Sequence, residues 1–175
     1  RKENEILRSQ LNEIRRILGI QYINTSNIYE YISRINKIKN NLLVVITAKD
    51  TPGMSISDKL LSQLKTLGIK SSLDNAHWCG YIAVIFRGVI LYENCEYQKK
   101  IEYKIKIQEL ELDILSAPLH CGNDSSTIIN GKEYSTKSRG LNFVVYDFDR
   151  KQVIDSVGFD THHRLLTATR KEIFQ

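Results

Sequence analysis

The sequence predicts an α+β domain of mostly antiparallel, sandwich-like β-sheets with a packed helix, preceded by an N-terminal helix of coiled-coil character. Three patterns carry this prediction. Apolar residues at the start recur at the spacing of a heptad seam. Leucines between residues 55 and 67 recur at helical spacing. From residue 81 to residue 159, short apolar segments alternate with turn signals, as in antiparallel sheets.

The N-terminal seam occupies residues 1–18, with alternating steps of three and four residues between its members Asn4, Leu7, Leu11, Ile14 and Leu18. This spacing is typical of coiled coils. We therefore expect a homo-oligomer, most simply a dimer, held through residues 1–18. The alternative is a terminal helix packed on its own domain.

The heptad pattern stops at Gly19, and residues 19–40 are expected to form a helical neck with Ser26 as the N-cap of its helix. A domain over residues 41–162 follows, with a tail at 163–175. Ser55 is expected to cap the leucine-rich helix, which Gly68 ends. Strands are expected at 42–48, 81–86, 89–92, 101–107, 110–117, 126–129, 132–134, 141–146 and 153–159.

Composition excludes several functional classes. The net charge of +5 is spread among acids, with no basic stripe interleaved with aromatic residues, so we expect no nucleic-acid partner. No apolar run is long enough to cross a membrane. Three distant cysteines fit neither a disulfide framework nor a zinc motif, and we expect no cofactor and no metal. The chain begins with Arg1, so we expect a piece of a longer protein, and its abundant Ile, Lys and Asn suggest a bacterial or phage source.

Two charged residues stand at the ends of apolar strands. Asp50 follows the segment 42–48, and Arg139 precedes the segment 141–146. An acid and an arginine on rigid elements can hold a polar ligand by directed hydrogen bonds. The alternative is an ion pair between the two that only closes the strand ends.

Two motifs together resemble a known family. The sequence SRGLNFVVYD, followed by a strand ending GFDT (138–161), looks like the first half of the domain shared by the interleukin-like EMT inducer cytokines and the stem of protein O-mannose N-acetylglucosaminyltransferase. The sequence VVITAKDTPGMS, the leucine-rich helix and Trp78 look like its second half. The order of the halves is permuted relative to the family, which single domains with neighbouring termini tolerate.

The resemblance implies a carbohydrate-contacting domain without catalytic machinery. The family's sugar site uses the arginine of the Arg-Gly strand, the aspartate of the Lys-Asp turn and a second arginine before the tryptophan. The first two correspond to Arg139 and Asp50, whereas Asn75 stands near the third, so the second arginine is absent. Trp78 is a candidate stacking surface for a sugar ring, although a lone tryptophan is also a common core residue.

The leading hypothesis is a non-catalytic glycan-recognition domain of a larger bacterial protein, such as a glycosyltransferase. That parent protein would decide whether the domain is cytoplasmic or associated with a membrane. An enzyme would need a deep pocket with perturbed acids, and the sequence contains no motif for one. A protein-interaction or oligomerisation module is the other alternative, and a large exposed apolar patch near Asp50 would favour it.

Overall fold

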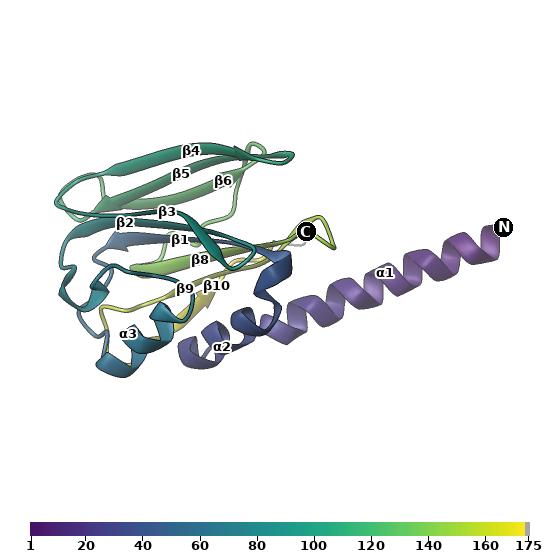
Figure 1. Cartoon of the computed structure of the whole chain (residues 1–175), viewed down its shortest axis with the longest axis horizontal. Coiled ribbons are helices and arrows are strands. Elements are labelled where there is room, and N and C mark those ends of the chain that lie inside the picture. Colours follow the sequence, from purple (N-terminus) through teal and green to yellow (C-terminus); the bar gives the residue numbers. More distant parts are fainter. Residues whose placement is uncertain (174–175) are drawn as a thin grey trace.

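The computed structural model describes residues 1–173, with only the backbone described at residue 12 and at residues 15–22. It confirms an α+β fold in three layers (Figure 1). Two layers are β-sheet, and the third consists of helices. The helices are α1 (Lys2–Ile23), α2 (Ile28–Ile38) and α3 (Asp58–Lys65), with short 3-10 turns at Lys39–Asn41 and Leu73–Asn75.

The strands form one continuous sheet that folds over on itself. The central layer runs β10-β9-β8-β1-β2-β3, and the outer layer runs β4-β5-β6-β7. Among the described strands, the only pairing between the two layers is a short parallel one of Lys49 and Asp50 with Ala117 and Pro118. Every other pairing among them is antiparallel. The strands are β1 (Leu42–Asp50), β2 (Cys79–Phe86), β3 (Val89–Tyr97), β4 (Ile101–Ile107), β5 (Leu110–Pro118), β6 (Asp124–Ile129), β7 (Lys132–Glu133), β8 (Gly140–Asp147), β9 (Gln152–Phe159) and β10 (Ala168–Arg170).

Strand β1 lies in the middle of the central layer. Val45 is paired with Val84 of β2 on one side and with Val144 of β8 on the other. The sequence-distant strands 42–48 and 141–146 are therefore direct neighbours. Because successive side chains of a strand point to opposite faces, β1 contributes to two cores. Val44 and Ile46 belong to the core beneath the helices, and Val45 belongs to the core between the two sheet layers.

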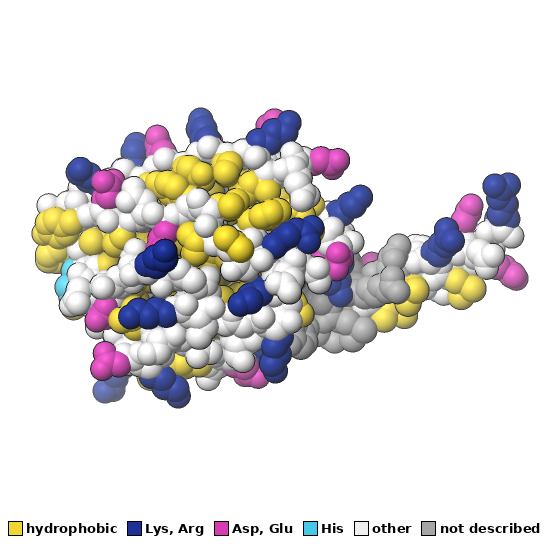
Figure 2. Space-filling model, viewed as in Figure 1, with side chains coloured by type: hydrophobic (Ala, Val, Ile, Leu, Met, Phe, Trp, Pro, Cys, Tyr) yellow, Lys and Arg dark blue, Asp and Glu magenta, His cyan; other side chains and the backbone are white. Residues whose placement is uncertain are grey.

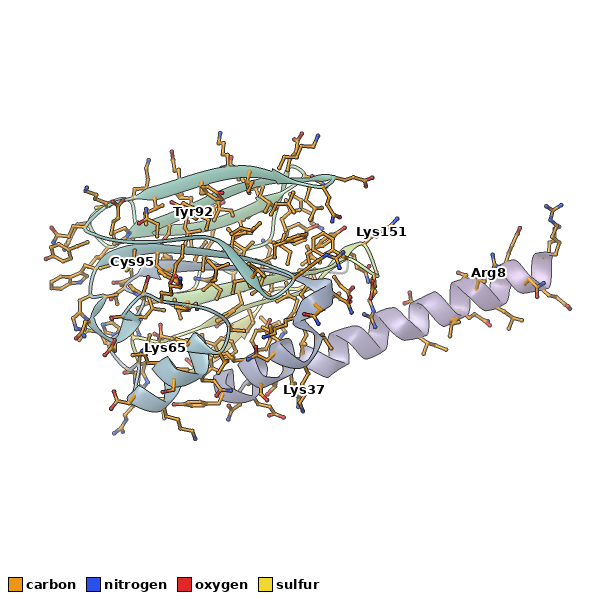
Figure 3. All side chains as sticks on the ribbon, in the orientation of Figure 1. Arg8, Lys37, Lys65, Tyr92, Cys95 and Lys151 are labelled. Carbon is orange, nitrogen blue, oxygen red and sulfur yellow. The ribbon has the colours of Figure 1, made fainter. Side chains whose placement is uncertain are left out.

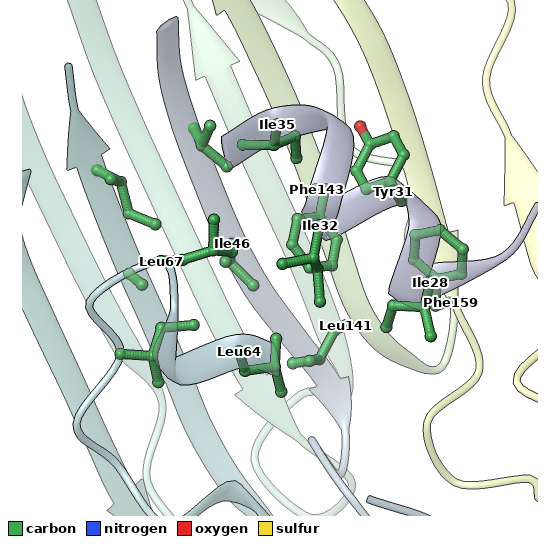
Figure 4. Packing of buried hydrophobic residues seen from close by; sticks show 14 of the residues in the cluster. Ile28, Tyr31, Ile32, Ile35, Ile46, Leu64, Leu67, Leu141, Phe143 and Phe159 are labelled. Carbon is green, nitrogen blue, oxygen red and sulfur yellow. The ribbon is translucent and has the colours of Figure 1, made fainter. Parts of the chain in front are cut away.

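The core on the helix side is built around aromatic side chains. Tyr31 of α2 packs against Phe143 and Phe159, with ring centroids 5.6 and 5.4 Å apart (Figure 4). Leu60 and Leu64 of α3 are fully buried in the same core. The segment predicted as a helical neck therefore supplies α2 as a structural part of the domain.

The core between the sheet layers changes character along its length. Aliphatic side chains fill the end near the start of β1. Towards the other end, buried hydroxyl groups replace them. Thr47 Oγ1 lies 2.6 Å from Ser125 Oγ, which lies 2.8 Å from Ser135 Oγ, so three hydroxyls form a hydrogen-bonded chain between the layers. Ser116 Oγ donates to the Ala48 carbonyl and accepts from the Tyr81 amide, which ties β5 to both β1 and β2.

Two edge strands, β3 of the central layer and β4 of the outer layer, meet along one side of the sandwich. Apolar side chains gather there in Figure 2. Tyr92 of β3 and Tyr103 of β4 stack with their centroids 3.7 Å apart and their planes 6° from parallel. The stacked rings cover the inter-sheet core at this side, where no strand pairing joins the layers.

Several helix boundaries differ from the sequence predictions. Helix α1 continues through Gly19, and the N-cap of α2 is Asn27 rather than Ser26, because the Asn27 side chain accepts from the Glu30 amide. Ser57 rather than Ser55 caps α3 by accepting from the Leu60 amide. These corrections shift the caps by one or two residues along the chain.

Strand β10 has no counterpart among the predicted elements. It lies in the segment expected to be a tail and pairs with β9. Arg170 forms a two-point ion pair with Asp155, with distances of 2.8 and 2.9 Å, and its Nη2 also donates to the Thr25 carbonyl. This arginine therefore fastens the end of the chain both to the central layer and to the turn between α1 and α2.

Helix α1 projects away from the domain (Figure 1). Ile23 at its end is fully buried, whereas Leu7, Leu11 and Ile14 are 60%, 46% and 53% exposed. This part of the helix does not pack on its own domain, contrary to the alternative considered above. Leu18 lies outside the described side chains. None of the described helices is long and apolar enough to cross a membrane.

We expect Phe143→Ala to lower the free energy of unfolding by about 3–5 kcal/mol, because it removes the ring that Tyr31 and Phe159 contact and leaves a cavity. Tyr97→Ala, at an exposed aromatic position, should change the free energy by less than about 0.5 kcal/mol. Urea denaturation followed by circular dichroism measures both. Equal losses in the two variants would contradict the helix-side core described here.

Candidate functional site

Asp50, the acid predicted as a site residue, is the last residue of β1 and lies at the surface. Asp50 has a positive φ of 68°, a conformation that aspartate tolerates better than most residues, and it turns the chain from the strand into Thr51. Its carbonyl accepts from the Leu119 amide at 3.2 Å. The residue is half-buried. Its carboxylate makes no hydrogen bond or ion pair with any described residue, so it is free to accept from a ligand.

Arg139 lies beside Asp50 because of the pairing between β1 and β8. Lys49 is paired with Gly140, so the next positions along the two antiparallel chains are Asp50 and Arg139. Gly140 has a φ of +97°, and a Cβ there would lie 2.4 Å from the Phe159 carbonyl oxygen. Only glycine fits this turn, which fixes where the chain places Arg139.

The guanidinium of Arg139 binds Asp160 rather than Asp50. Nε donates to Oδ1 at 3.1 Å, and Nη2 donates to Oδ2 at 2.7 Å. The hydrogen bond with Asp160 is the main cause of the raised pKa of Arg139, and the charge of Asp50 adds to it. Burial tends to raise the pKa of Asp160, but its bonds with Arg139 and with backbone amides outweigh that effect and lower it.

A guanidinium has five N–H donors, and the pair with Asp160 uses two of them. Arg139 is also 42% exposed in its side chain. It therefore keeps three donors for a further partner while Asp160 holds its plane in place. The alternative of an ion pair between Asp50 and Arg139 is wrong, because Arg139 pairs with Asp160. Asp160 belongs to the GFDT motif and directly follows β9, but it was not among the predicted site residues.

A loop brings Trp78 to the same end of β1. The Thr51 hydroxyl donates to the Ala76 carbonyl at 3.4 Å and accepts from the Trp78 amide at 3.1 Å. Trp78 has a positive φ of 55° and is 44% exposed, so it is not the core residue that the alternative supposed. Asn75 is exposed on the preceding turn, where its amide contacts Asp74 at 3.5 Å. We call Asp50, Trp78, Arg139 and Asp160 the rim.

Exposed apolar side chains surround the rim. The Leu119 amide donates to the Asp50 carbonyl, which places Leu119 next to Asp50. The Met54 amide donates to the carbonyl of Thr161, the residue after Asp160. Tyr97 precedes Gln98, whose amide donates to the Trp78 carbonyl. All three are exposed, and Figure 2 shows apolar side chains beside a histidine at the end of the molecule away from α1. We call Met54, Tyr97 and Leu119 the apolar surround of the rim.

The described residues contain no group of three or more His, Cys, Asp or Glu side chains placed to hold a metal ion. Cys121 donates its thiol to the Gln98 carbonyl at 3.1 Å. Burial raises the pKa of Cys79, and burial together with the neighbouring Cys79 raises the pKa of Cys95 to about 12. At neutral pH both of these thiols are protonated and are weak nucleophiles.

Comparison of the chain with family models, with curated proteins and with solved structures finds no match. The rim therefore has to be interpreted from its own chemistry. It offers one carboxylate acceptor, three guanidinium donors and an exposed indole face.

We expect Asp160→Asn to reduce the loss in free energy of unfolding that occurs as the pH becomes acidic. Because the pKa of Asp160 is lowered in the folded state, its ion pair stabilises the fold above about pH 4 and loses that effect as the pH falls through the folded-state pKa. The wild type should lose about 0.2–1 kcal/mol more than the variant between about pH 7 and about pH 2.5, the range measured for solvent-exposed ion pairs. Urea denaturation at several pH values measures the difference.

The control is Asp149→Asn, at an exposed acid in the turn between β8 and β9. Its stability should parallel that of the wild type across the same pH range. If Asp160→Asn also parallels the wild type, then the Arg139–Asp160 pair does not contribute to stability.

Proposed function

We propose that this domain recognises a glycan and performs no chemistry on it. The observation that carries the proposal is the free Asp50 carboxylate beside an Arg139 guanidinium that a second acid already orients. Sugar hydroxyls both donate and accept, so a carboxylate and a guanidinium on one edge can each bind neighbouring hydroxyls of one ring. The exposed indole of Trp78 offers an apolar face for the ring itself.

The sequence resemblance described above supports the same proposal. The family's site arginine and site aspartate correspond to Arg139 and Asp50, and in this fold the two positions are neighbours across paired strands. Asn75 replaces the second arginine with a neutral amide, which favours a sugar without an acidic group over an anionic one. On this proposal the domain is an accessory part of a larger glycan-related protein, such as a glycosyltransferase.

The apolar surround of the rim favours a second candidate, a protein-interaction module. Met54, Tyr97 and Leu119 are all exposed, and each is bonded through its backbone to the rim or to its neighbour Thr161, or lies next to a residue that is. A group of exposed apolar side chains is typical of a protein interface. The two candidates differ in what they need. A glycan depends on the Asp50 and Arg139 side chains, whereas a protein partner depends mainly on the apolar residues around them.

We expect a glycan to shift the amide resonances of the rim, with a dissociation constant on the order of micromolar to millimolar, because shallow polar sites retain little binding energy after desolvation. A glycan array selects the ligand, and an NMR titration measures affinity. Asp50→Ala should weaken binding about tenfold or more, since a hydrogen bond to a charged group is lost. Arg139→Lys should also weaken binding, because a lysine lacks the planar fork.

Asp149→Asn serves as the control, since it removes an exposed acid from the opposite end of the sheet. It should bind as the wild type does. If no glycan shifts the rim, or if folded Asp50→Ala and Arg139→Lys variants bind unchanged, then the glycan proposal fails. A protein partner lost with Tyr97→Ala but not with Asp50→Ala would establish the second candidate.

We further propose that α1 pairs with the α1 of a second copy. Three of its described apolar residues, Leu7, Leu11 and Ile14, share the seam and are exposed. Pairing would bury them, and Asn4 at a seam position would favour one alignment of two strands. Two copies would also raise avidity for a polymeric glycan, because the second engagement becomes intramolecular.

In sedimentation experiments, we expect the wild type to shift from monomer towards dimer as its concentration rises. The double variant Leu7→Glu with Leu11→Glu should remain monomeric, since it places charges in the seam. Arg8→Gln, which lies outside the seam spacing, should associate like the wild type. A wild type that stays monomeric at high concentration rules out this role for α1.

A further inference from the structure

A cavity separate from the rim opens at the opposite end of the sandwich. It has a volume of about 470 Å³ and lies between the β5–β6–β7 edge and the β8–β9 hairpin. Its apolar floor includes Leu110, Ile129 and Val153, which are buried members of the inter-sheet core, and Ile173 packs against the same core and also lines the cavity. A volume in this range is typical of small-molecule sites, and an apolar floor is their usual lining. We call it the end cavity.

Two tyrosines stand in the walls of the end cavity. Tyr134 follows β7 and Tyr146 belongs to β8, and both are partly buried. Neither phenol hydroxyl forms a hydrogen bond with any described residue. Burial raises the pKa of both phenols, and the pKa of Tyr146 is raised further by nearby Glu109, Asp147 and Tyr134. Both hydroxyls therefore remain protonated well above neutral pH and are available as donors.

Two lysines, Lys132 and Lys151, complete the mouth of the end cavity. The ammonium of Lys132 lies 5.2 Å from the centroid of the Tyr134 ring, which holds it over the opening. Neither lysine forms an ion pair with any described residue, and none of the described lining residues is acidic. Two acids act electrostatically on Tyr146: Glu109, and Asp147, which also binds Arg150. Figure 3 shows Lys151 at the end of the domain from which α1 projects.

We propose that the end cavity binds a small amphipathic anion, with a carboxylate, sulfonate or phosphate head and an aromatic or short aliphatic body. The head would accept from the ammonium groups of Lys132 and Lys151 and from the two phenols. The body would lie on Leu110, Ile129 and Val153 and exclude water from them. A neutral sugar does not fit this division into a charged mouth and an apolar floor, so the end cavity and the rim serve different ligands.

The test uses the full chain and an anionic fluorescent probe, 8-anilinonaphthalene-1-sulfonate, with decanoate as a competitor. We expect saturable fluorescence enhancement that decanoate reverses. Lys132→Glu and Lys151→Glu should each weaken probe binding about tenfold, because each replaces an attractive charge by a repulsive one. Lys65→Glu, at an exposed lysine of α3, is the matched control and should bind the probe as the wild type does.

Amide chemical shifts locate the probe independently of its affinity. We expect changes at Leu110, Ile129 and Val153 and none at Asp50, and Tyr146→Phe should weaken binding while keeping the shape of the wall. The proposal is overturned if the probe gives no saturable signal. It is also overturned if Lys65→Glu weakens binding as much as Lys132→Glu, or if the shifts map elsewhere on the domain. Asp50→Ala should leave probe binding unchanged, so this result stands apart from that of the glycan titration.

Discussion

The burial of β1 on both faces is the constraint on which the rest of the fold depends. Its odd-numbered side chains face the outer layer and its even-numbered ones face the helices, so every position from Leu42 to Ala48 is buried. A strand in this position needs side chains that are apolar or, like Thr47, hydrogen-bonded, and it needs a partner strand on each side, which β2 and β8 supply. The apolar run ends where the strand leaves both cores. Asp50 is consequently exposed enough to meet a ligand while its backbone remains fixed.

Short-range residue patterns made most of the helices and strands predictable from the sequence. Asn130 and Gly131 both take positive φ angles, as a two-residue hairpin requires, and the β6–β7 turn lies where these residues predict it. Strand β10 could not be found in this way. It is held by pairing with β9 and by the ion pair of Arg170 with Asp155, two residues that are fifteen positions apart. A three-residue strand without its own apolar pattern depends on such tertiary contacts.

The rim was predictable only in part. The resemblance to a known family led us to expect Asp50 and Arg139 in one site. The pairing of β1 with β8 is the physical reason why the two positions are neighbours. The true partner of Arg139 was not evident, because Asp160 reaches it only through the alignment of β8 with β9. The exposure of Trp78 depends on a left-handed backbone and on a bond to Thr51, neither of which composition reveals.

The hydroxyl chain between the layers has a consequence for strand register. Aliphatic side chains alone would let two sheet layers slide past one another at modest cost. A slip of β1 by one residue would move Thr47 out of reach of Ser125 and into the helix-side core, where its hydroxyl would have no partner. The chain of hydroxyls thus penalises a shifted register of β1, and it favours a single alignment for the strand that carries Asp50.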